Sequence, residues 1–454
     1  MIHRLFVANR GEIALRIVRA ANALGMESVL AVSAADKHSL AAREASRALL
    51  IGPPSARDSY LNAPLLVHAA LAAGCDAVHP GYGFLSERQS FAKLCEDNQL
   101  TFVGPRSETI GAVGDKLAAR RLASAANIPM VAGTAKIDSV TEALDIATTI
   151  GYPVITKASA GGGGRGMRVA HNADELRASF DRSSNEALEA FGDGTLYLER
   201  FVARARHVEV QVLGDGHGEV LHFGERDCTL QRRYQKMMEE APAVALSDAV
   251  RARLHRAAID LLRPINYRNA GTVEFLYDVE REEFFFMEVN ARIQVEHPVT
   301  EMVTGFDLVQ LQLRVASEGW LPISQGDIRI KGHAVEMRLL AEDPRRDFLP
   351  NPGRVSEWQF DTSQSGVRLD SAMFNGAVIS PFYDSMVGKL LAHADERGAA
   401  LSLISSVLDD ARITGVRSNL ELLRFVAKHA DVRGNALDTR WAERVLMPQF
   451  LSTN

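Results

Sequence analysis

The chain has 454 residues, 46% of them hydrophobic, and a formal net charge of −6 at pH 7. This length predicts about three domains with substantial cores, and the acidic balance argues against a nucleic-acid-binding or membrane-surface protein. The three cysteines form no CxxC pair, which excludes a disulfide framework or a cysteine zinc site. No apolar run could span a bilayer and no signal peptide is visible, so we expect a cytoplasmic protein.

The N-terminal part of the chain predicts alternating strands and helices. Short apolar runs predict strands at residues 5–8, 28–32, 77–79 and 101–103. Helical spacing of apolar residues predicts helices at residues 13–24, 64–73 and 91–98. This series is typical of a parallel, doubly wound sheet. The turn formers HPGYGFLSE (residues 79–87) follow a strand at the sheet edge where such folds bind ligands, although a plain loop fits their composition nearly as well.

A helix is expected at residues 116–126, followed by a glycine-rich segment, YPVITKASAGGGGRGMRVA (residues 152–170). A dinucleotide fingerprint should open a helix, but residues 167–170 predict a strand, and Met167 stands where a Walker A loop requires lysine. We therefore predict a flexible hairpin whose backbone N–H groups close over phosphates. Lys157 and Arg165 are placed to meet the same phosphates.

The segment GERDCTLQRRYQKMMEE (residues 224–240) concentrates arginines and a lysine beside two glutamates. Its donors are Arg226, Arg232, Arg233 and Lys236. A mixed charge run of this kind is either a solvated face or an anion-binding site, and the composition favours neither. Cys228 is expected to be a structural thiol, because no partner base is visible.

Two strands, residues 271–277 and 284–290, flank a polar loop and predict a hairpin. If the hairpin is centred near residue 281, Glu274 lies directly opposite Glu288. Like charges at such a position are destabilising, so a cation between them is expected. Mg²⁺ is favoured because it takes a few protein oxygens, with Asn290 as a third ligand. A half-solvated hairpin without metal is the alternative.

Polar residues alternate with apolar ones after this hairpin. In extended chain they would line one face while the intervening residues pack inward. The polar set is Glu288, Asn290, Arg292, Gln294 and Glu296. The Arg and Gln suit an anionic substrate. Beyond residue 331 the chain is rich in turn formers, apart from a helix expected at residues 397–410.

These segments together resemble biotin carboxylase, an ATP-grasp enzyme and the subunit of acetyl-CoA carboxylase that loads carbon dioxide onto biotin. The motifs run through nearly the whole chain: ANRGEIALRI, HPGYGFLSE, GDK, the glycine loop, RHVEVQVL, ERDCTLQRR, EVNARIQVEHPVTE, AEDP, FLPNPG and PFYDSMVGKL. The resemblance implies an α/β and α+β multidomain fold. Its parts would be a Rossmann-like N-terminal domain (1–114), an ATP-grasp domain (115–330) with a mobile glycine-rich lid (about 131–203), and a mixed, β-rich C-terminal domain (331–446).

The resemblance also implies roles for matching residues. ATP-binding positions are Lys116, Lys157, Gly163, Gly164, Met167, Glu199, Arg200, Phe201, Val202, His207, Gln231, Tyr234, Leu276, Glu274 and Glu288. Glu274, Glu288 and Asn290 match ligands of two Mg²⁺ or Mn²⁺ ions. Lys236, Arg292, Gln294 and Val295 match the bicarbonate pocket. Tyr82 and Arg338 match biotin-binding positions, and Arg292, Glu296, Lys236 and Arg338 match the catalytic set, with Glu296 as base for bicarbonate.

The implied reaction uses ATP to form carboxyphosphate from bicarbonate, and biotin then attacks the carbon dioxide released. No AMKM-like biotinylation motif occurs and no carboxyltransferase region follows, so we expect the biotin to be carried by a separate biotin carboxyl carrier protein. A carboxyltransferase partner and a homodimer are also implied. The final acceptor is not readable: acetyl-CoA, as in fatty acid biosynthesis, is expected, with another acyl-CoA or pyruvate as alternatives.

Three residues depart from the family pattern. Tyr234 replaces a usual histidine near the nucleotide, Thr156 replaces an aliphatic residue, and Ala160 is a smaller change at the glycine loop. Two other functions stay open. Another ATP-grasp ligase would share the lysines and metal carboxylates but need not keep residues 292–296 or Arg338. A non-catalytic paralogue that only binds nucleotide has Tyr234 as its sole support.

Overall fold

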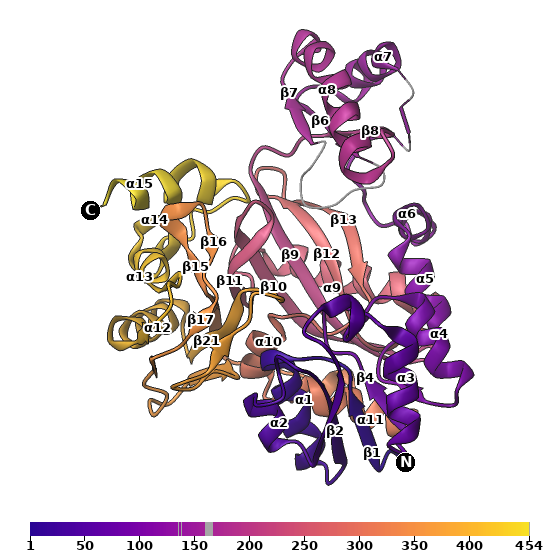
Figure 1. The fold of residues 1–454 in the computed structure, drawn as a ribbon. Helices are drawn as coiled ribbons and strands as arrows, with labels where there is room; N and C mark the ends of the chain where they lie inside the picture. Colours follow the sequence, from indigo (N-terminus) through magenta and orange to yellow (C-terminus); the bar gives the residue numbers. More distant parts are fainter. Residues whose placement is uncertain (135, 138, 159–166, 454) are drawn as a thin grey trace.

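The computed structural model describes residues 1–134, 136–137, 139–158 and 167–453. Figure 1 shows an N-terminal unit in indigo, a small purple unit that projects from the top of the molecule, and an orange-to-yellow C-terminal unit. A large sheet lies between them. The predicted glycine loop, with Gly163, Gly164, Arg165 and Ala160, lies outside the described residues. Within the described part, no helix has both the length and the apolarity to cross a membrane.

The N-terminal unit is a five-stranded parallel sheet in the order β3-β2-β1-β4-β5. Its strands are β1 (Arg4–Val7), β2 (Glu27–Ser33), β3 (Arg47–Gly52), β4 (Ala77–His79) and β5 (Thr101–Phe102). The helices are α1 (Gly11–Ala23), α2 (Leu40–Glu44), α3 (Ala63–Ala72), α4 (Gln89–Asp97) and α5 (Ser107–Gly114). The predicted doubly wound sheet is confirmed, and the edge strand β3 is the strand of this sheet that the sequence did not predict.

The projecting unit is a three-stranded antiparallel sheet, β7-β6-β8, covered by two helices. Its elements are α7 (Val140–Ile150), β6 (Val154–Ala158), β7 (Arg168–Ala170), α8 (Ala173–Phe191) and β8 (Leu196–Arg200). Helix α8 begins at Asn172, whose side chain accepts from the Glu175 N–H, and ends at the left-handed Gly192. The unit has a separate apolar core, and α6 (Lys116–Ala125) leads into it.

An eight-stranded sheet forms the centre, in the order β13-β12-β9-β10-β11-β14-β21-β19. Its strands are β9 (Ala205–Asp215), β10 (Val220–Arg232), β11 (Gln235–Ala241), β12 (Arg268–Asp278), β13 (Glu283–Asn290), β14 (His333–Leu340), β19 (Val367–Ser371) and β21 (Met386–Ala394). Strand β14 pairs with β11 on one side and β21 on the other. The sheet therefore runs unbroken from the central part of the chain into the C-terminal part.

Helices and short ladders cover this sheet. The helices are α9 (Asp248–Leu262), α10 (His297–Thr304), α11 (Leu308–Glu318), α12 (Arg397–Asp410), α13 (Leu420–Lys428), α14 (Ala430–Arg433) and α15 (Met447–Ser452). The short ladders pair β15 (Glu342–Asp343) with β16 (Leu349–Pro350), β17 (Gly353–Arg354) with β20 (Val378–Ile379), and β18 (Glu357–Gln359) with β22 (Arg412–Thr414). The helix predicted at residues 397–410 is confirmed.

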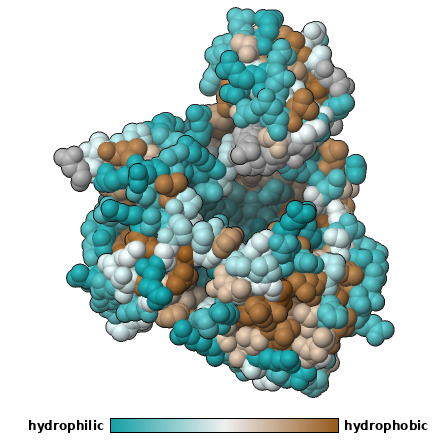
Figure 2. All heavy atoms as spheres, in the orientation of Figure 1, coloured by the Kyte–Doolittle hydropathy of each residue, from teal (hydrophilic) through white to brown (hydrophobic). Residues whose placement is uncertain are grey.

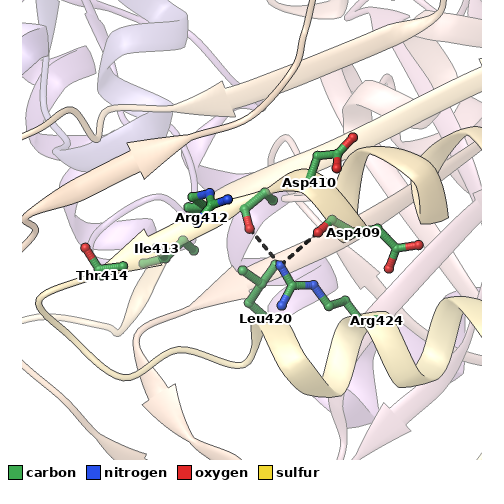
Figure 3. A pocket seen from close by; sticks show the side chains of 8 residues that line it. Asp409, Asp410, Arg412, Ile413, Thr414, Leu420 and Arg424 are labelled. Atoms are coloured by element: carbon green, nitrogen blue, oxygen red, sulfur yellow. Dashed lines mark hydrogen bonds between the residues drawn. The ribbon is translucent and has the colours of Figure 1, made fainter.

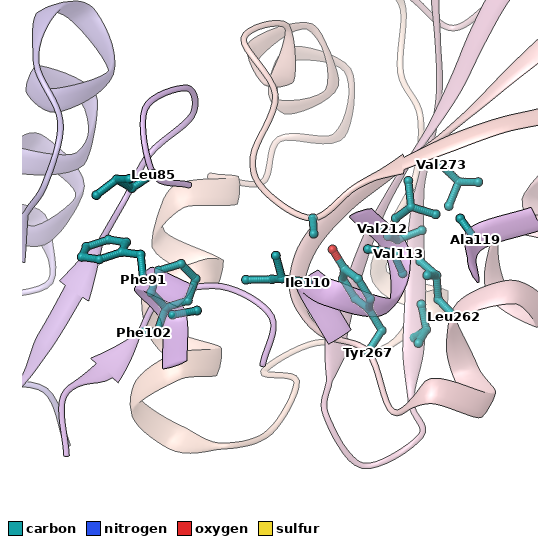
Figure 4. Close-up of a cluster of buried hydrophobic side chains, with 14 of the residues drawn as sticks. Leu85, Phe91, Phe102, Ile110, Val113, Ala119, Val212, Leu262, Tyr267 and Val273 are labelled. Atoms are coloured by element: carbon teal, nitrogen blue, oxygen red, sulfur yellow. The ribbon is translucent and has the colours of Figure 1, made fainter. Parts of the chain in front are cut away.

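One apolar cluster joins the N-terminal unit to the central sheet. Figure 4 shows Ile110 and Val113 of α5 and Ala119 of α6 beside Val212 and Tyr267 of the central part, and all of these side chains are buried. Burial of apolar area on this scale is the main stabilising contribution to a fold. The shared core fixes the edge of the N-terminal sheet relative to the β12–β13 hairpin, which carries Glu274 and Glu288.

Candidate active site

The polar residues predicted from sequence line a hollow between the three units. Figure 2 shows this hollow below the projecting unit, with a visible wall that is mostly hydrophilic. Strands β9 to β14 of the central sheet supply most of its charged side chains. Several carboxylates in it are more than nine-tenths buried, and the cations that meet them are buried or partly buried. Buried charges are stable only when paired, so their contacts define the site.

The β12–β13 hairpin places Glu274 directly opposite Glu288, as predicted. A register shift follows this pair, because Phe275 lies opposite Phe286 and leaves Met287 as an extra residue. Such a bulge re-aims the side chains beside it. Glu288 is exposed, whereas its strand partner Glu274 is buried. Although Glu288 is open to the hollow, its carboxyl is partly desolvated among the groups that line it, and this desolvation and the charge of Glu274 raise its pKa above the ordinary value.

The prediction of one extended polar face is correct only as far as Asn290. Strand β13 ends there, and the next residues form an irregular segment that ends at Glu296, the residue before α10. Pro298 in the first turn of α10 is typical of a helix start, which accounts for the end of the extended chain. The side chains still converge. Arg292 donates to Asn290 (3.0 Å) and Gln294 (2.6 Å), and Gln294 donates to Glu274 (3.2 Å).

Lys236 lies at the centre of the carboxylates. Its Nζ is 2.6 Å from both Glu209 and Glu296 and 3.3 Å from Glu274. Burial opposes its charge, but Cys228 and these carboxylates together raise the pKa of Lys236 well above its usual value. The ammonium group is therefore a fixed positive charge in the floor of the hollow.

Glu296 links Lys236 to Arg338 of β14. The Arg338 guanidinium is 2.9 Å from Glu296 and 2.6 Å from Glu239. Although burial opposes ionisation, Lys236 and Arg338 hold the pKa of Glu296 well below its usual value. Burial raises the pKa of Glu239 to about 7, so the two carboxyl groups that share Arg338 differ in acidity.

The opposed carboxylates fit a hard divalent cation. Glu274 is held by His207 at 3.0 Å and receives a hydrogen bond from Asn290 at 2.9 Å, which orients it beside exposed Glu288. The Asn290 side-chain oxygen and both carboxylates are the ligand type that Mg²⁺ prefers. His207 faces the same carboxylate, and Glu274 outweighs burial to raise the pKa of its imidazole.

The residues predicted to bind nucleotide surround the upper end of the hollow. Lys157 of β6 is 2.6 Å from Glu199 of β8, and Arg120 is 2.9 Å from the same carboxylate. Burial opposes the charge of Lys157, but Glu199 raises its pKa above the usual value. In this arrangement Glu199 neutralises the lysine that was predicted from sequence to meet a phosphate.

The other predicted nucleotide residues lie on four neighbouring elements. Met167, Arg200, Phe201 and Val202 are half-buried at the ends of β7 and β8, Gln231 is buried on β10, and Leu276 pairs with His207 between β12 and β9. Arg440 lies 5.6 Å from the ring of Phe201. Lys116 is exposed at the start of α6. Tyr234, at the β10–β11 turn, is 57% exposed with a positive φ.

The two remaining predicted residues lie at the lower end, beside the N-terminal unit. The Tyr82 hydroxyl donates to Glu12 of α1, and the main-chain carbonyl of Val295 accepts from Lys389 at 2.7 Å.

Thr156, which departs from the family pattern, is buried and donates to Ser183 and to the Arg168 carbonyl. Its hydroxyl is therefore hydrogen-bonded within the core of the projecting unit.

The donors of the charge run at residues 224–240 do not share one face, because they lie in different surroundings. Arg226 is fully buried and donates to Glu209 (2.6 Å), Gln211 (2.8 Å) and two threonines. Arg232 and Arg233 bind Asp347 at 2.5 and 3.2 Å. Of the four donors, Arg226 and Lys236 both contact Glu209, and Lys236 also contacts Glu274 and Glu296. These residues lie on the paired strands β10 and β11 or at the turn between them, and successive side chains of a strand point to opposite faces, so the donors reach different surroundings.

Sequence reasoning missed two carboxylates of the site. Glu209 holds Lys236 and Arg226, and the alternation of His207, Glu209 and Gln211 along β9 could have placed it on the polar face. Glu87 lies 2.8 Å from Arg292 and accepts the Ala291 N–H at 3.1 Å. It ends the segment 79–87, so part of that segment does border the site.

A separate cavity of about 350 Å³ lies on the C-terminal unit, between α12, β22 and α13. Figure 3 shows the Arg424 guanidinium in it, turned toward the main-chain oxygens of Asp409 and Ala411, to which it donates. None of the predicted site residues lines this cavity. Its arginine is held by the C-terminal end of α12, which makes it part of the packing of that unit.

Comparison with known protein families identifies the class of enzyme to which the chain belongs. The family described as "Carbamoyl-phosphate synthase L chain, ATP binding domain" matches residues 115–324, which identifies the central part as the ATP-binding domain of an ATP-grasp ligase. "Biotin carboxylase, N-terminal domain" matches residues 1–110, and "Biotin carboxylase C-terminal domain" matches residues 336–444. The chain belongs to the biotin carboxylase family, whose members are ATP-dependent ligases, and the resemblance seen in the sequence is confirmed.

Relatives and solved structures agree. Biotin carboxylase 1 of Bacillus subtilis is 44% identical over 98% of this chain and 98% of its own length. Methylcrotonoyl-CoA carboxylase subunit alpha of Glycine max is 44% identical over the whole chain, which spans 62% of that relative. The biotin carboxylase domain dimer of Hydrogenobacter thermophilus 2-oxoglutarate carboxylase, in complex with MgADP, ADP and bicarbonate, superposes with a TM-score of 0.92. It is 41% identical, and the match covers 100% of this chain and 99% of that one.

Proposed function

We propose that the chain carboxylates biotin at the expense of ATP and bicarbonate, as the first half-reaction of acetyl-CoA carboxylase, with the biotin on a separate carrier protein. The observation that carries this proposal is the junction at Glu296. One ionised carboxylate there meets both Lys236 and Arg338, at 2.6 and 2.9 Å. An ATP-grasp ligase for another carboxylate substrate does not require this pair of cations around a base.

The bicarbonate pocket is formed by Lys236, Arg292, Gln294 and the backbone of Val295. The two cations attract the anion, and Glu296 is the base that removes its proton while it attacks the γ-phosphate of ATP. Entry of an anion beside Lys236 offsets part of the positive charge that lowers the pKa of Glu296. The carboxylate thereby becomes a stronger base when its substrate is bound.

Carboxyphosphate then breaks down to carbon dioxide and phosphate inside the site. The phosphate takes the proton from the ureido nitrogen of biotin, and that nitrogen attacks the carbon dioxide. Negative charge develops on the ureido oxygen during this step. Arg338 stabilises that oxyanion, because a fixed guanidinium in a water-poor site lowers the energy of developing charge. Tyr82 borders the position of the biotin ring.

Glu274, Glu288 and Asn290 would hold Mg²⁺, and two ions accompany ATP in this proposal. Their oxygen donors and the direct opposition of the two carboxylates support the assignment. When bound, the metal neutralises charge on the transferring phosphoryl group. The chain itself orients these ligands through His207 and Gln294, each of which contacts Glu274.

Nucleotide binding is assigned to the residues at the upper end of the hollow, with the projecting unit as a lid. Lys157 would leave Glu199 to meet a phosphate, and Lys116 would meet another. Glu199 to Val202 would hold the adenine, and Met167, His207, Gln231, Tyr234 and Leu276 complete the pocket. Closure is required because carboxyphosphate is readily lost to water.

A homodimer and a carboxyltransferase partner belong to the same proposal. The biotin carboxylase domain of 2-oxoglutarate carboxylase was solved as a dimer, and relatives are subunits of methylcrotonoyl-CoA, propionyl-CoA and pyruvate carboxylases. These relatives favour one second candidate, the same half-reaction for another acyl-CoA or for pyruvate. The test is to add each acceptor, together with its carboxyltransferase, to the carboxylated carrier protein. The acceptor that becomes carboxylated identifies the correct candidate.

The half-reaction is tested by ADP release with Mg²⁺ and bicarbonate, with and without free biotin. Biotin-stimulated, bicarbonate-dependent release is expected, and it should vanish in Glu288→Lys, which puts a cation at the metal position. Release that ignores biotin would favour a different ATP-grasp substrate. ATP binding without any release would favour the non-catalytic paralogue.

A further inference from the structure

Lys389 is a fully buried lysine that the proposed reaction does not use. It lies on β21, directly opposite Arg338 of β14, so both cations project from the same face of the sheet. Like charges at directly opposed positions are destabilising unless other groups offset them. The offsetting groups differ, because Arg338 contacts Glu239 and Glu296 whereas Lys389 contacts other segments.

The ammonium group of Lys389 joins three parts of the chain. It donates to the main-chain carbonyl of Val295 at 2.7 Å, and it lies 3.3 Å from Glu12 and 4.0 Å from Asp370. Burial opposes its charge, but Glu12 and the carboxylates near it raise the pKa of Lys389 above its usual value. A charged donor is therefore fixed between the N-terminal unit, the segment before α10 and the C-terminal unit.

The contact with Val295 holds the peptide group that leads into Glu296. The carbonyl of Val295 and the N–H of Glu296 belong to one planar peptide group, so holding the oxygen fixes the plane from which the Glu296 side chain departs. Glu296 is also the residue before α10, where the backbone leaves the irregular segment. Lys389 thus anchors the peptide that lies between the proposed bicarbonate pocket and the proposed base.

The contact with Glu12 extends to Tyr82. Glu12 is buried in the first turn of α1, and its Oε1 atom both faces Lys389 and accepts the Tyr82 hydroxyl. The other carboxylate oxygen has no partner among the described residues. The orientation of Tyr82 therefore depends on a carboxylate that the lysine holds from the opposite side.

We propose that Lys389 is a positioning residue for both the bicarbonate end and the biotin end of the site. It holds the Val295–Glu296 peptide directly, and it holds Tyr82 through Glu12. The proposal rests on the function proposed above. Lys389 thereby aligns bicarbonate, the base Glu296 and biotin, although the lysine itself touches none of the reactants.

Lys389→Met removes the donor and keeps the aliphatic stem. We expect the KM for bicarbonate to rise about tenfold and kcat to fall, because a small displacement of a reacting group has large effects on rate. The KM for ATP should stay within about twofold, since the nucleotide residues lie on other elements. Glu12→Gln should instead raise the KM for biotin and leave the KM for bicarbonate within about twofold.

Lys428→Met is the matched control. It removes an exposed lysine of the same unit, which is paired with Asp409 at 2.6 Å, and should change none of the three KM values. A fall in melting temperature with all KM values unchanged in Lys389→Met would overturn the proposal. If Lys389→Met does not fold, an unchanged KM for biotin in Glu12→Gln overturns it. Absence of bicarbonate-dependent ADP release in the unmodified chain would instead refute the proposed function, and this inference with it.

Discussion

Replacing Glu288 by glutamine should make the metal-free protein slightly more stable and the enzyme inactive. Opposed like charges on neighbouring strands cost about 0.2–1 kcal/mol. Here Glu288 is exposed, and Glu274 is offset by Lys236 at 3.3 Å and His207 at 3.0 Å. The gain should therefore lie at the lower end, about 0.3 kcal/mol, because solvent and counter-charges screen the repulsion.

The stability difference should depend on pH with a defined sign. Partial desolvation of its carboxyl inside the hollow and the charge of Glu274 raise the pKa of Glu288 in the folded state. A carboxyl with a raised folded pKa binds its proton more tightly when folded, so stability falls as the pH rises from the unfolded pKa to the folded one. Glu288→Gln removes this loss. Its advantage should be absent in acid, where Glu288 is protonated, and complete once the pH exceeds the folded pKa of Glu288.

The response of stability to Mg²⁺ should show whether the Glu274–Glu288 pair is a metal site or only a pair of repelling carboxylates. Unfolding with denaturant, after treatment with a chelator, measures the metal-free free energy, and the same titration with ADP and Mg²⁺ measures the ligand effect. A ligand at 100 times its Kd stabilises by about 2.7 kcal/mol, and most of this should be lost in Glu288→Gln. Destabilisation of the metal-free variant, or an unchanged response to Mg²⁺ with ADP, would refute the assignment.

The same hairpin supplies a matched control. Glu283 lies directly opposite Asp278 at the other end of the two strands, which makes a second opposed pair of carboxylates. Glu283→Gln should give a gain of similar size, about 0.2–0.5 kcal/mol, since the pairing geometry is the same. Its response to Mg²⁺ and its ADP release should equal those of the unmodified chain, because no metal is assigned to that pair.

Three other changes test different parts of the site. Glu296→Gln should lower biotin-dependent turnover at least about 100-fold in steady-state assays, because it removes the proposed base, and a loss below tenfold would contradict that role. Tyr234→His should not reduce turnover when ADP release is compared at saturating ATP, and a large loss would mean that the nucleotide end is tuned for tyrosine. Arg226→Met should destabilise the fold by about 3–5 kcal/mol in denaturant titrations, because buried Glu209 loses a partner, and an unchanged midpoint would refute this estimate.

Local patterns in the sequence were sufficient to predict four of the five N-terminal strands, the hairpin and its opposed carboxylates. Strands alternate with a period of two residues, so a short polar loop between two strands fixes which residues face each other. The Glu274–Glu288 pair was predictable for this reason. The bulge at Met287 was not, because an extra residue in one strand leaves no mark in the alternation.

Contacts between distant segments could not be predicted from the residues alone. Glu296 meets Arg338 because β14 joins the sheet beside β11 and α10 begins where the irregular segment ends. Arg226 could not be told from its neighbours Arg232 and Arg233, since a charge run looks the same whether a strand later buries it or not. The resemblance to biotin carboxylase supplied what spacing could not.

The most direct test of the proposed reaction is transfer of label from ¹⁴C-bicarbonate to free biotin, with ATP and Mg²⁺, by the unmodified chain and by Glu288→Gln. Acid-labile label on biotin, formed in a fixed ratio to ADP by the unmodified chain and absent with the variant, is the expected result. ADP formation without labelled biotin would contradict the proposal that this chain carboxylates biotin.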